Sequence, residues 1–297
     1  MNRVNKTKII ADTGCSLTQE IIDKYNLSVM GMKIVLDEKT YTDYEELSKG
    51  EFYSKIENVD EFHTAQPAVG EIQKYYEKIF EEGYENIIDI HFSSKMSGLI
   101  DSCQMAKNTM NNGNIKIIDT ETVSIGSYMV LIRILELLDS GKSIEEIEEL
   151  LPRIKENVGF QFSVPNIKYL IKNGRVGKAE GLAGTLLNIK PILSVDEGQI
   201  YPLAKIRGMK KVFTAMAKNA VEFLKDRPYN IKIYKTWGLD HNKPDMDKMF
   251  DEFMRSFEKL EYDNYKIIED QLPPTIICHS GPEVIGLAVY GEKEEIK

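Results

Sequence analysis

The sequence predicts an α/β fold of two domains, the first on a mostly parallel sheet flanked by helices and the second on a mixed or antiparallel sheet. Three observations lead to this prediction. The chain has 297 residues, about twice the ~150 of a typical single domain. In its first half, short apolar runs alternate with segments of helical spacing, which is the pattern of βαβ units. After Gly141 the alternation changes and a hairpin pattern follows.

Four apolar runs of the first half are expected to be strands, because each is short and ends in a turn marked by glycine, serine or aspartate. The runs are KIIA at 8–11, VMGMKIVL at 29–36, NIIDIHF at 86–92 and IKIID at 115–119. Helical spacing lies between and after them, at 17–26, 43–57, 70–82, 97–111 and 121–140. A serine at position 48 is placed to cap the second of these helices. Parallel sheets bind ligands beyond the carboxyl ends of their strands, so the turns after the strands are the candidate binding segments.

The second half predicts a charged helix at 143–157, a strand at 158–164 and a domain boundary near 155–166. We therefore expect an N-terminal α/β domain with Rossmann-like layering over 1–160 and a C-terminal α/β domain over 161–297. Two strands around an Asp-Glu-Gly turn at 193–206 form the hairpin pattern. The remaining expected elements are helices at 166–173, 208–226 and 245–260, and strands at 231–237, near 265–269 and near 275–278.

Composition excludes several classes of partner. A net charge of −9 and a pI near 5.2 disfavour nucleic acid and anionic membranes, because both require a basic surface. No run approaches the ~20 apolar residues of a membrane span, and the N-terminus lacks the apolar core of a secretory signal. Three scattered cysteines fit neither a zinc site nor a disulfide framework. We expect a cytoplasmic protein without stable membrane insertion and without a metal.

Two segments resemble functional motifs, one of an aspartic protease and one of a phosphate-binding loop, but the sequence around them does not support either function. Asp12-Thr13-Gly14 follows an apolar run as in an aspartic protease, but its only mate, Asp139-Ser140-Gly141, ends a helical pattern. A strand-to-helix turn capped by Ser16 or Thr13 is the simpler interpretation. The glycines from Gly174 to Gly181 do not have the spacing of a phosphate-binding Walker loop, and no dinucleotide fingerprint is present. We expect no cofactor.

Three polar segments are candidate binding sites. Ser93, Ser94, Ser97 and Gly98 lie between a strand and a helix, where backbone N–H groups and hydroxyls suit a carboxylate, although Ser97 could equally be an N-cap. Thr64 and Gln66 precede a proline in a turn, and a purely local role for Thr64 is equally open. His279 follows an apolar run, a position more typical of a structural histidine.

Six segments together resemble the DegV family of fatty-acid-binding proteins. They are ADTGCSL at 11–17, TAQP at 64–67, SSKMSG at 93–98, NGRVGKAEG at 173–181, NIKPIL at 188–193 with KIRGMKK at 205–211, and HSGP at 279–282. The resemblance implies that Thr64, Ser97 and His279 bind the carboxylate of a fatty acid enclosed between the two domains. It also implies that Ser93, Ser94, Gly98 and Gln66 lie near the head group, that Asp12 holds loops together, and that Arg207 serves phosphoryl transfer or a partner contact.

The sequence departs from the family pattern beside three of these positions. Ala65 replaces a serine, Leu99 and Ile100 replace Thr-Tyr, and Glu283 stands where the family has glycine. The second change makes the wall beside Ser97 more apolar. Ala65 removes a hydroxyl, and Glu283 adds a carboxylate close to His279 in the sequence.

The function implied by the resemblance is that of the fatty-acid-binding subunit of a bacterial fatty acid kinase. Such a chain buries a long-chain fatty acid and presents the carboxylate to a separate ATP-binding kinase, which forms the acyl phosphate for phospholipid synthesis. It has no catalytic residue of its own, because phosphoryl transfer needs a triphosphate site that the sequence lacks. A lipid carrier without a kinase partner, or a hydrolase that uses Asp12 or Ser97, are the alternatives.

Overall fold

The computed structural model describes residues 6–110, 114–182 and 189–297. The chain divides into two compact units, Met1–Ile147 with Pro273–Thr275, and Glu148–Leu272 with Ile276–Lys297. The division falls inside helix α6 (Ile144–Glu156), before the boundary expected at residue 160. That expected boundary lies inside strand β8 (Val158–Ser163), which pairs with strands of the second unit. Asn188, in one of the motifs, is outside the described residues.

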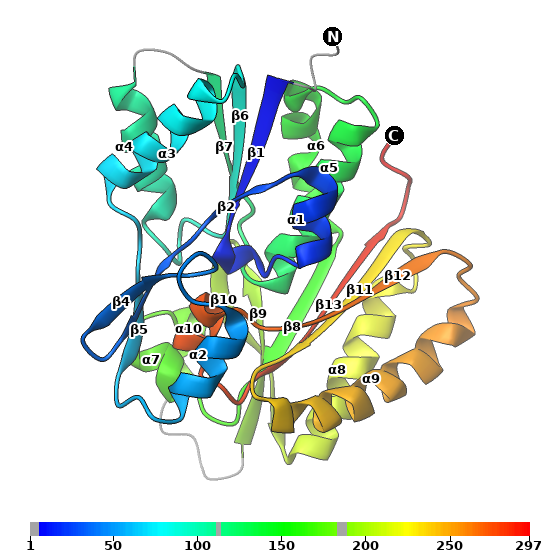
Figure 1. The fold of residues 1–297 in the computed structure, drawn as a ribbon. Helices are drawn as coiled ribbons and strands as arrows, with labels where there is room; N and C mark the ends of the chain where they lie inside the picture. The colour runs from blue at the N-terminus through cyan, green and yellow to red at the C-terminus, as the bar shows by residue number, and fades with distance from the viewer. Residues whose placement is uncertain (1–5, 111–113, 183–188) are drawn as a thin grey trace. The chain divides into compact units, whose positions relative to one another are not determined.

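The first unit is built on a four-stranded parallel sheet, as predicted. Its strand order is β2 (Ser28–Met30), β1 (Thr7–Asp12), β6 (Asn86–His91) and β7 (Asn114–Asp119). Helices α3 (Val69–Glu81) and α4 (Leu99–Thr109) cover one face, and α1 (Gln19–Tyr25) and α5 (Ile125–Asp139) cover the other (Figure 1). Apolar side chains of the sheet, α3 and α4 form one core, including Ile10, Ile72 and Ile87.

The run predicted as one strand at 29–36 is two strands in different sheets. β2 ends at Met30, and β3 (Lys33–Leu36) joins a separate antiparallel sheet with β4 (Lys39–Thr42) and β5 (Phe62–Ala65). Gly31 lies at the break, where a Cβ would come within 2.3 Å of the Asp43 carbonyl oxygen. The helix expected at 43–57 is only α2 (Lys49–Ile56), which begins after a capping box of Ser48 and Glu51.

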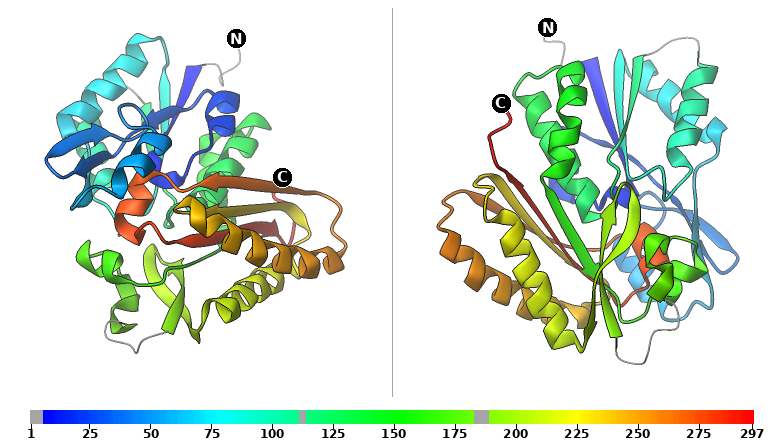
Figure 2. Two further views of the ribbon diagram at one scale, coloured as in Figure 1. Left: turned by 60° about the horizontal axis from the view of Figure 1, so that its bottom comes forward. Right: turned by 180° about the vertical axis from the view of Figure 1, so that it is seen from behind.

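The second unit contains a six-stranded mixed sheet, again as predicted. Its order is β10 (Gln199–Arg207), β9 (Ile189–Asp196), β8, β13 (Ile285–Glu292), β11 (Tyr229–Trp237) and β12 (Tyr265–Gln271). β11 and β12 are parallel and the other neighbours are antiparallel. Helices α8 (Met209–Leu224) and α9 (Lys243–Phe257), yellow and orange in Figure 2, lie side by side on this sheet and complete a large apolar core.

Two corrections concern the last part of the chain. The segment expected as a strand at 275–278 is the start of helix α10 (Pro274–Ser280), which two prolines introduce. β13, buried along its whole length, is not among the predicted strands. A short helix, α7 (Lys168–Lys172), matches the helix expected at 166–173. Among the helices that the structure describes, none combines the length and apolar character that spanning a bilayer requires.

Candidate functional site

Asp12, the last residue of β1, holds together the loops that follow β1 and β6. One carboxylate oxygen accepts a hydrogen bond from the Gly14 N–H at 2.6 Å, and the other accepts from the Phe92 N–H at 3.0 Å and faces His91 Nδ1 at 2.9 Å. The side chain is fully buried. Because its oxygens already bind these groups away from solvent, the geometry gives Asp12 the organising role that was expected, and offers no support for a hydrolytic one.

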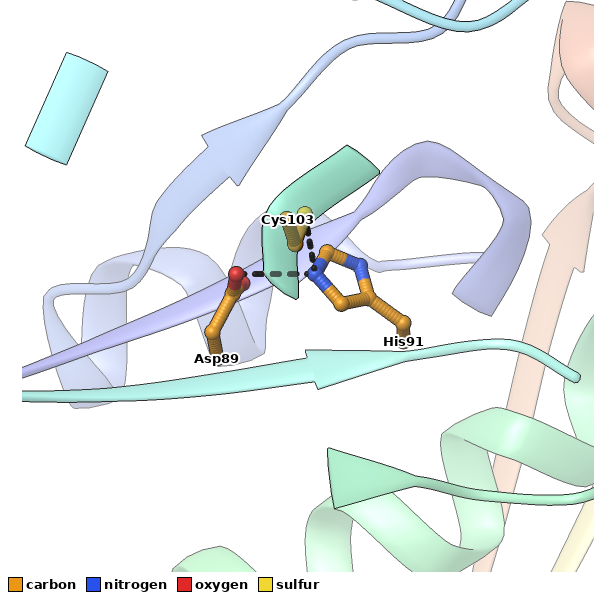
Figure 3. Close-up of side chains that lie close together, drawn as sticks. All are labelled: Asp89, His91 and Cys103. Carbon is orange, nitrogen blue, oxygen red and sulfur yellow. Dashed lines mark hydrogen bonds and ion pairs between the residues drawn. The ribbon is translucent and has the colours of Figure 1, made fainter. Parts of the chain in front are cut away.

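His91 lies between two buried carboxylates, as Figure 3 shows on its Asp89 side. Its Nδ1 faces Asp12, and its Nε2 lies 2.9 Å from an Asp89 oxygen and 3.3 Å from the Cys103 sulfur. Tyr76 donates a hydrogen bond to the same Asp89 oxygen. Burial alone would lower the pKa of His91, but the negative charges of Asp89 and its neighbours outweigh burial and raise this pKa well above its usual value. The ring is an imidazolium at neutral pH.

The turn after β6 carries the predicted serines. Ser93 is buried, and its hydroxyl accepts from the Lys95 N–H at 3.1 Å, whereas Ser94 is exposed and its N–H donates to Asp119 at 3.2 Å. Ser97 is half-buried and stands one residue before Gly98, the N-cap of α4. Its hydroxyl oxygen accepts from the Leu99 N–H at 3.2 Å. Within the described residues, the Ser97 hydroxyl proton has no acceptor, so it can be donated to a ligand.

The Thr64 segment adjoins the Ser97 segment. Thr64 lies in β5, where it pairs with Ile34 of β3. Two residues later, the Gln66 amide donates to the Ser102 hydroxyl at 2.6 Å, one turn into α4. The same side chain covers Gly98, because a Cβ at that glycine would lie 2.8 Å from Gln66 Oε1. The structure thus brings together two segments that are more than thirty residues apart in the sequence.

A second buried carboxylate, Asp43, ties the segment 273–275 into the first unit. The backbone N–H and the hydroxyl of Thr275 both donate to Asp43, and the Thr275 hydroxyl also lies 2.9 Å from that of Thr13. Burial raises the pKa of Asp43 to about 6, although the hydrogen bonds from Thr275 oppose the rise. This cluster anchors the start of α10, a short distance along the chain from the end of β12 at Gln271.

In the second unit, His279 lies on α10 rather than at a strand end. Burial, together with the positive charge of Arg175, lowers the pKa of His279 to about 4, so its imidazole is neutral at neutral pH. Gly281 has a φ of 78° and no room for a Cβ against the Tyr169 ring. Glu283 is exposed, and its carboxylate oxygen lies 3.3 Å from His241 Nε2.

Arg207 ends β10, an edge strand of the six-stranded sheet. It is exposed, as is Lys205 on the same face of the strand, two residues earlier. Lys210 and Lys211 follow in the first turn of α8, and both are exposed. These four cations form a basic surface at the β10–α8 corner.

A cavity of about 310 Å³ lies away from all the predicted site residues. It is at the amino end of β1, where its walls include Lys8, Lys24, Tyr25 and Tyr84. The Lys8 ammonium lies 5.3 Å from the centre of the Tyr84 ring. Neither the turn that carries Ser97 nor strand β5, which carries Thr64, lines it.

Sequence reasoning missed the buried cluster of Asp89, His91, Cys103 and Tyr76, as well as the pair of Asp43 and Thr275. A signal for the first was present: Asp89 and His91 interrupt the apolar run NIIDIHF two residues apart, and so point to one face of the sheet. No comparable signal exists for Asp43, because its partner lies 232 residues away.

The comparisons with known proteins agree with this architecture. The family model of the uncharacterised DegV proteins matches residues 6–292. A DegV domain-containing protein of Clostridium acetobutylicum is 30% identical over 290 residues, covering 97% of this chain and 100% of that one. One from Staphylococcus aureus strain MRSA252 is 30% identical, covering 96% and 99%.

Solved structures share the fold as well. The structure of a fatty-acid-binding DegV family protein from Thermus thermophilus is 26% identical, with a TM-score of 0.85 over 96% of this chain and 99% of that one. DegV from Bacillus subtilis, also described as a fatty acid binding protein, is 24% identical, with a TM-score of 0.84 over 97% and 99% of the two chains. The match extends over nearly the whole length in both sequence and fold, and this chain belongs to the DegV family.

Proposed function

We propose that the protein binds a long-chain fatty acid and that Thr64 and Ser97 receive its carboxylate. The observation that carries the proposal is the packing of Gln66 over Gly98 and Ser102, which keeps the Thr64 and Ser97 segments side by side at the carboxyl end of the parallel sheet. Both segments occupy positions at which the family resemblance predicts head-group contacts. Fatty acid binding by the Thermus thermophilus relative, at 26% identity, supports the same ligand class.

The energetics assign different tasks to the two ends of such a ligand. Burying about 15 apolar carbons contributes on the order of 12 kcal/mol of gross transfer free energy, so the tail supplies the affinity. A buried carboxylate costs several kcal/mol unless it accepts hydrogen bonds. The Ser97 hydroxyl proton, directed to no other acceptor among the described residues, is suited to offset that cost. The Thr64 hydroxyl is the second proposed donor, and the neutral imidazole of His279 is the third group that the resemblance assigns.

We further propose that the bound carboxylate is presented to a separate ATP-binding kinase, with the protein acting as the acyl-carrying subunit. The basic surface of Lys205, Arg207, Lys210 and Lys211 supports a contact of this kind, because a cluster of cations on an otherwise acidic chain suits a phosphorylated substrate or an acidic partner. Arg207 is the residue proposed for phosphoryl transfer or for the partner contact.

Native mass spectrometry of the purified protein, followed by extraction and identification of the ligand, tests the binding proposal. We expect one fatty acid per chain, lost in the double variant Thr64→Val, Ser97→Ala. The control is Ser54→Ala, which removes an exposed serine hydroxyl of α2 and should leave occupancy unchanged. A protein that arrives empty and takes up neither palmitate nor oleate would refute fatty acid binding.

A second assay separates a kinase subunit from a carrier. Arg207→Ala should still bind fatty acid, but should slow acyl phosphate formation when the protein is mixed with a DegV-dependent fatty acid kinase and ATP. Lys218→Ala, which removes an exposed lysine from the middle of α8, is the matched control. If the wild-type protein binds fatty acid yet no acyl phosphate forms, the role of a lipid carrier replaces that of a kinase subunit.

A further inference from the structure

The buried cluster of Asp89, His91 and Cys103 has the donor set of a transition-metal site. It offers one carboxylate oxygen, one imidazole nitrogen and one sulfur, and all three atoms lie within 4.8 Å of one another. Figure 3 shows the Asp89 and Cys103 side chains converging on the same ring nitrogen, His91 Nε2. Asp89 and His91 come from β6 and Cys103 from α4, so the sheet and a covering helix both contribute.

The distances leave room for an ion after a small adjustment. His91 Nε2 is 2.9 Å from Asp89 Oδ2 and 3.3 Å from Cys103 Sγ. Zinc bonds of about 2.0–2.3 Å in a tetrahedron would set neighbouring donor atoms roughly 3.3–3.6 Å apart. The two distances from His91 Nε2 must therefore grow by only a few tenths of an ångström, and the Asp89 oxygen and the Cys103 sulfur lie within 4.8 Å of each other. Side-chain torsions can supply changes of this size.

The orientation of His91 is fixed by a carboxylate on its other side. Asp12 Oδ2 lies 2.9 Å from Nδ1, and Asp12 is itself held by the N–H groups of Gly14 and Phe92. A carboxylate that accepts the Nδ1–H leaves Nε2 as the ligating nitrogen, an arrangement common around histidine ligands of zinc. The ion takes the place of the Nε2 proton, which is released when the metal binds. Hydrogen bonding within the first unit thus directs Nε2 toward Asp89 and Cys103.

An unsatisfied atom gives an independent indication. Asp89 is 0% exposed, and its Oδ1 has no hydrogen-bond partner within the described part of the chain. A buried carboxylate oxygen without a donor is costly and usually has a reason, such as an ion. Its other oxygen already receives the Tyr76 hydroxyl and faces His91.

We propose that Asp89, His91 and Cys103 bind a zinc-class divalent ion, with the Tyr76 hydroxyl or a water in the fourth position. Sulfur and nitrogen donors favour zinc or cobalt over magnesium and calcium, which take oxygen ligands. One thiolate and one carboxylate neutralise the ion, so burial requires no further counter-charge. The ion would join α4 to β6 close to the turn that carries Ser97, and so fix the start of that helix. This proposal does not rest on the proposed lipid ligand.

Because the cluster is fully enclosed, the ion should enter as the chain folds. The test is to unfold the full-length protein in chelator, refold it with zinc or cobalt, remove free metal and measure bound metal by mass spectrometry. We expect one equivalent. Cobalt should also give a thiolate-to-metal charge-transfer band and the intense visible bands of a tetrahedral site.

Cysteine variants assign the band to Cys103. The double variant Cys15→Ser, Cys278→Ser leaves Cys103 as the one thiol of the chain and should keep the band, whereas Cys103→Ser should lose it. Because the double variant has no other thiol, a band in this variant comes from Cys103 even if Cys103→Ser does not fold. Two results would overturn the proposal: refolded wild-type protein that retains only traces of either metal, or a band that persists in folded Cys103→Ser. The cluster would then be a hydrogen-bonded network without a metal.

Discussion

The two units fill the space between sheet and helices in different ways. In the second unit, the layer under α8 and α9 consists mainly of apolar side chains such as Met249, Phe253 and Leu287. One buried polar side chain there, Gln161, donates a hydrogen bond to the Met216 carbonyl of α8. In the first unit, the layer under α3 and α4 is also apolar, but it encloses Asp89, His91 and Tyr76 in a connected polar network.

This difference matters because the two kinds of core constrain geometry differently. Apolar packing is not directional and tolerates exchange of similar side chains. A buried polar network fixes the direction of each group, and is costly when any member is removed. The polar network includes residues of β6 and α4, the two elements that flank the turn carrying Ser97. We therefore infer that the first unit tolerates fewer substitutions but holds this proposed carboxylate donor in a fixed place.

The largest effect is expected from removing the centre of the network. His91→Leu keeps a side chain of moderate size but leaves Asp12 and Asp89 as two buried carboxylates without the cation between them. Breaking a buried ion pair in this way costs about 3–5 kcal/mol. Thermal unfolding of both proteins after refolding in chelator should show the loss, and hydrogen exchange should place the increased opening in β1 and β6. Exchange that stays unchanged in these strands would contradict the view that the network holds them.

The second effect depends on pH and involves Asp43. Its pKa of about 6 lies above the ordinary 3.8, so the folded state binds this proton more tightly than the unfolded state does. The stability from protonated Asp43 is complete below pH 3.8 and is lost as pH rises through 6. The loss amounts to about 3 kcal/mol above that range. An asparagine side chain cannot ionise and keeps an oxygen for the Thr275 donors, so Asp43→Asn should gain stability over the wild type as pH rises from about 4 to about 7.

Melting temperatures of Asp43→Asn and wild type across this pH range measure the effect. Asp23→Asn, which changes an exposed carboxylate on α1, serves as the control and should follow the wild-type curve. Parallel curves for Asp43→Asn and wild type between about pH 5 and pH 7 would mean that Asp43 ionises without cost in the folded protein.

The parts of the fold that could be predicted are those with a local signal. Buried parallel strands are short apolar runs, and helix starts such as Ser48 carry their own cap, so the strands of the parallel sheet and the helices between them follow from the sequence. The segment from Thr275 to Cys278 was wrongly predicted as a strand, because a short apolar run fits a strand and a buried helix equally well. The exposed strands β4 and β5 have no periodicity strong enough to distinguish them from a loop.

The candidate site also has features with a local sequence signal and features without one. Ser97 could be singled out because a polar turn after a predicted strand is visible in the sequence, whereas Thr64, which lies in the unpredicted strand β5, was singled out by the family resemblance. The closeness of their two segments depends on Gln66 reaching Ser102, which is a property of how α4 packs. The importance of His91 depends likewise on Asp12 and Cys103, residues brought to it by another strand and by a helix. Contacts of this kind join residues that are far apart in the chain, so no spacing of residues in the sequence indicates them.

The smallest effect is expected in the apolar core of the second unit. Met249 is fully buried there, and Met249→Leu keeps nearly the same volume without adding a polar atom. Such exchanges usually cost less than about 1.5 kcal/mol, well below the loss expected for His91→Leu. Calorimetry of both variants under one condition makes the comparison direct. A loss for Met249→Leu as large as that for His91→Leu would mean that shape complementarity constrains the second unit as strictly as hydrogen bonding constrains the first, and the proposed distinction between the cores would fail.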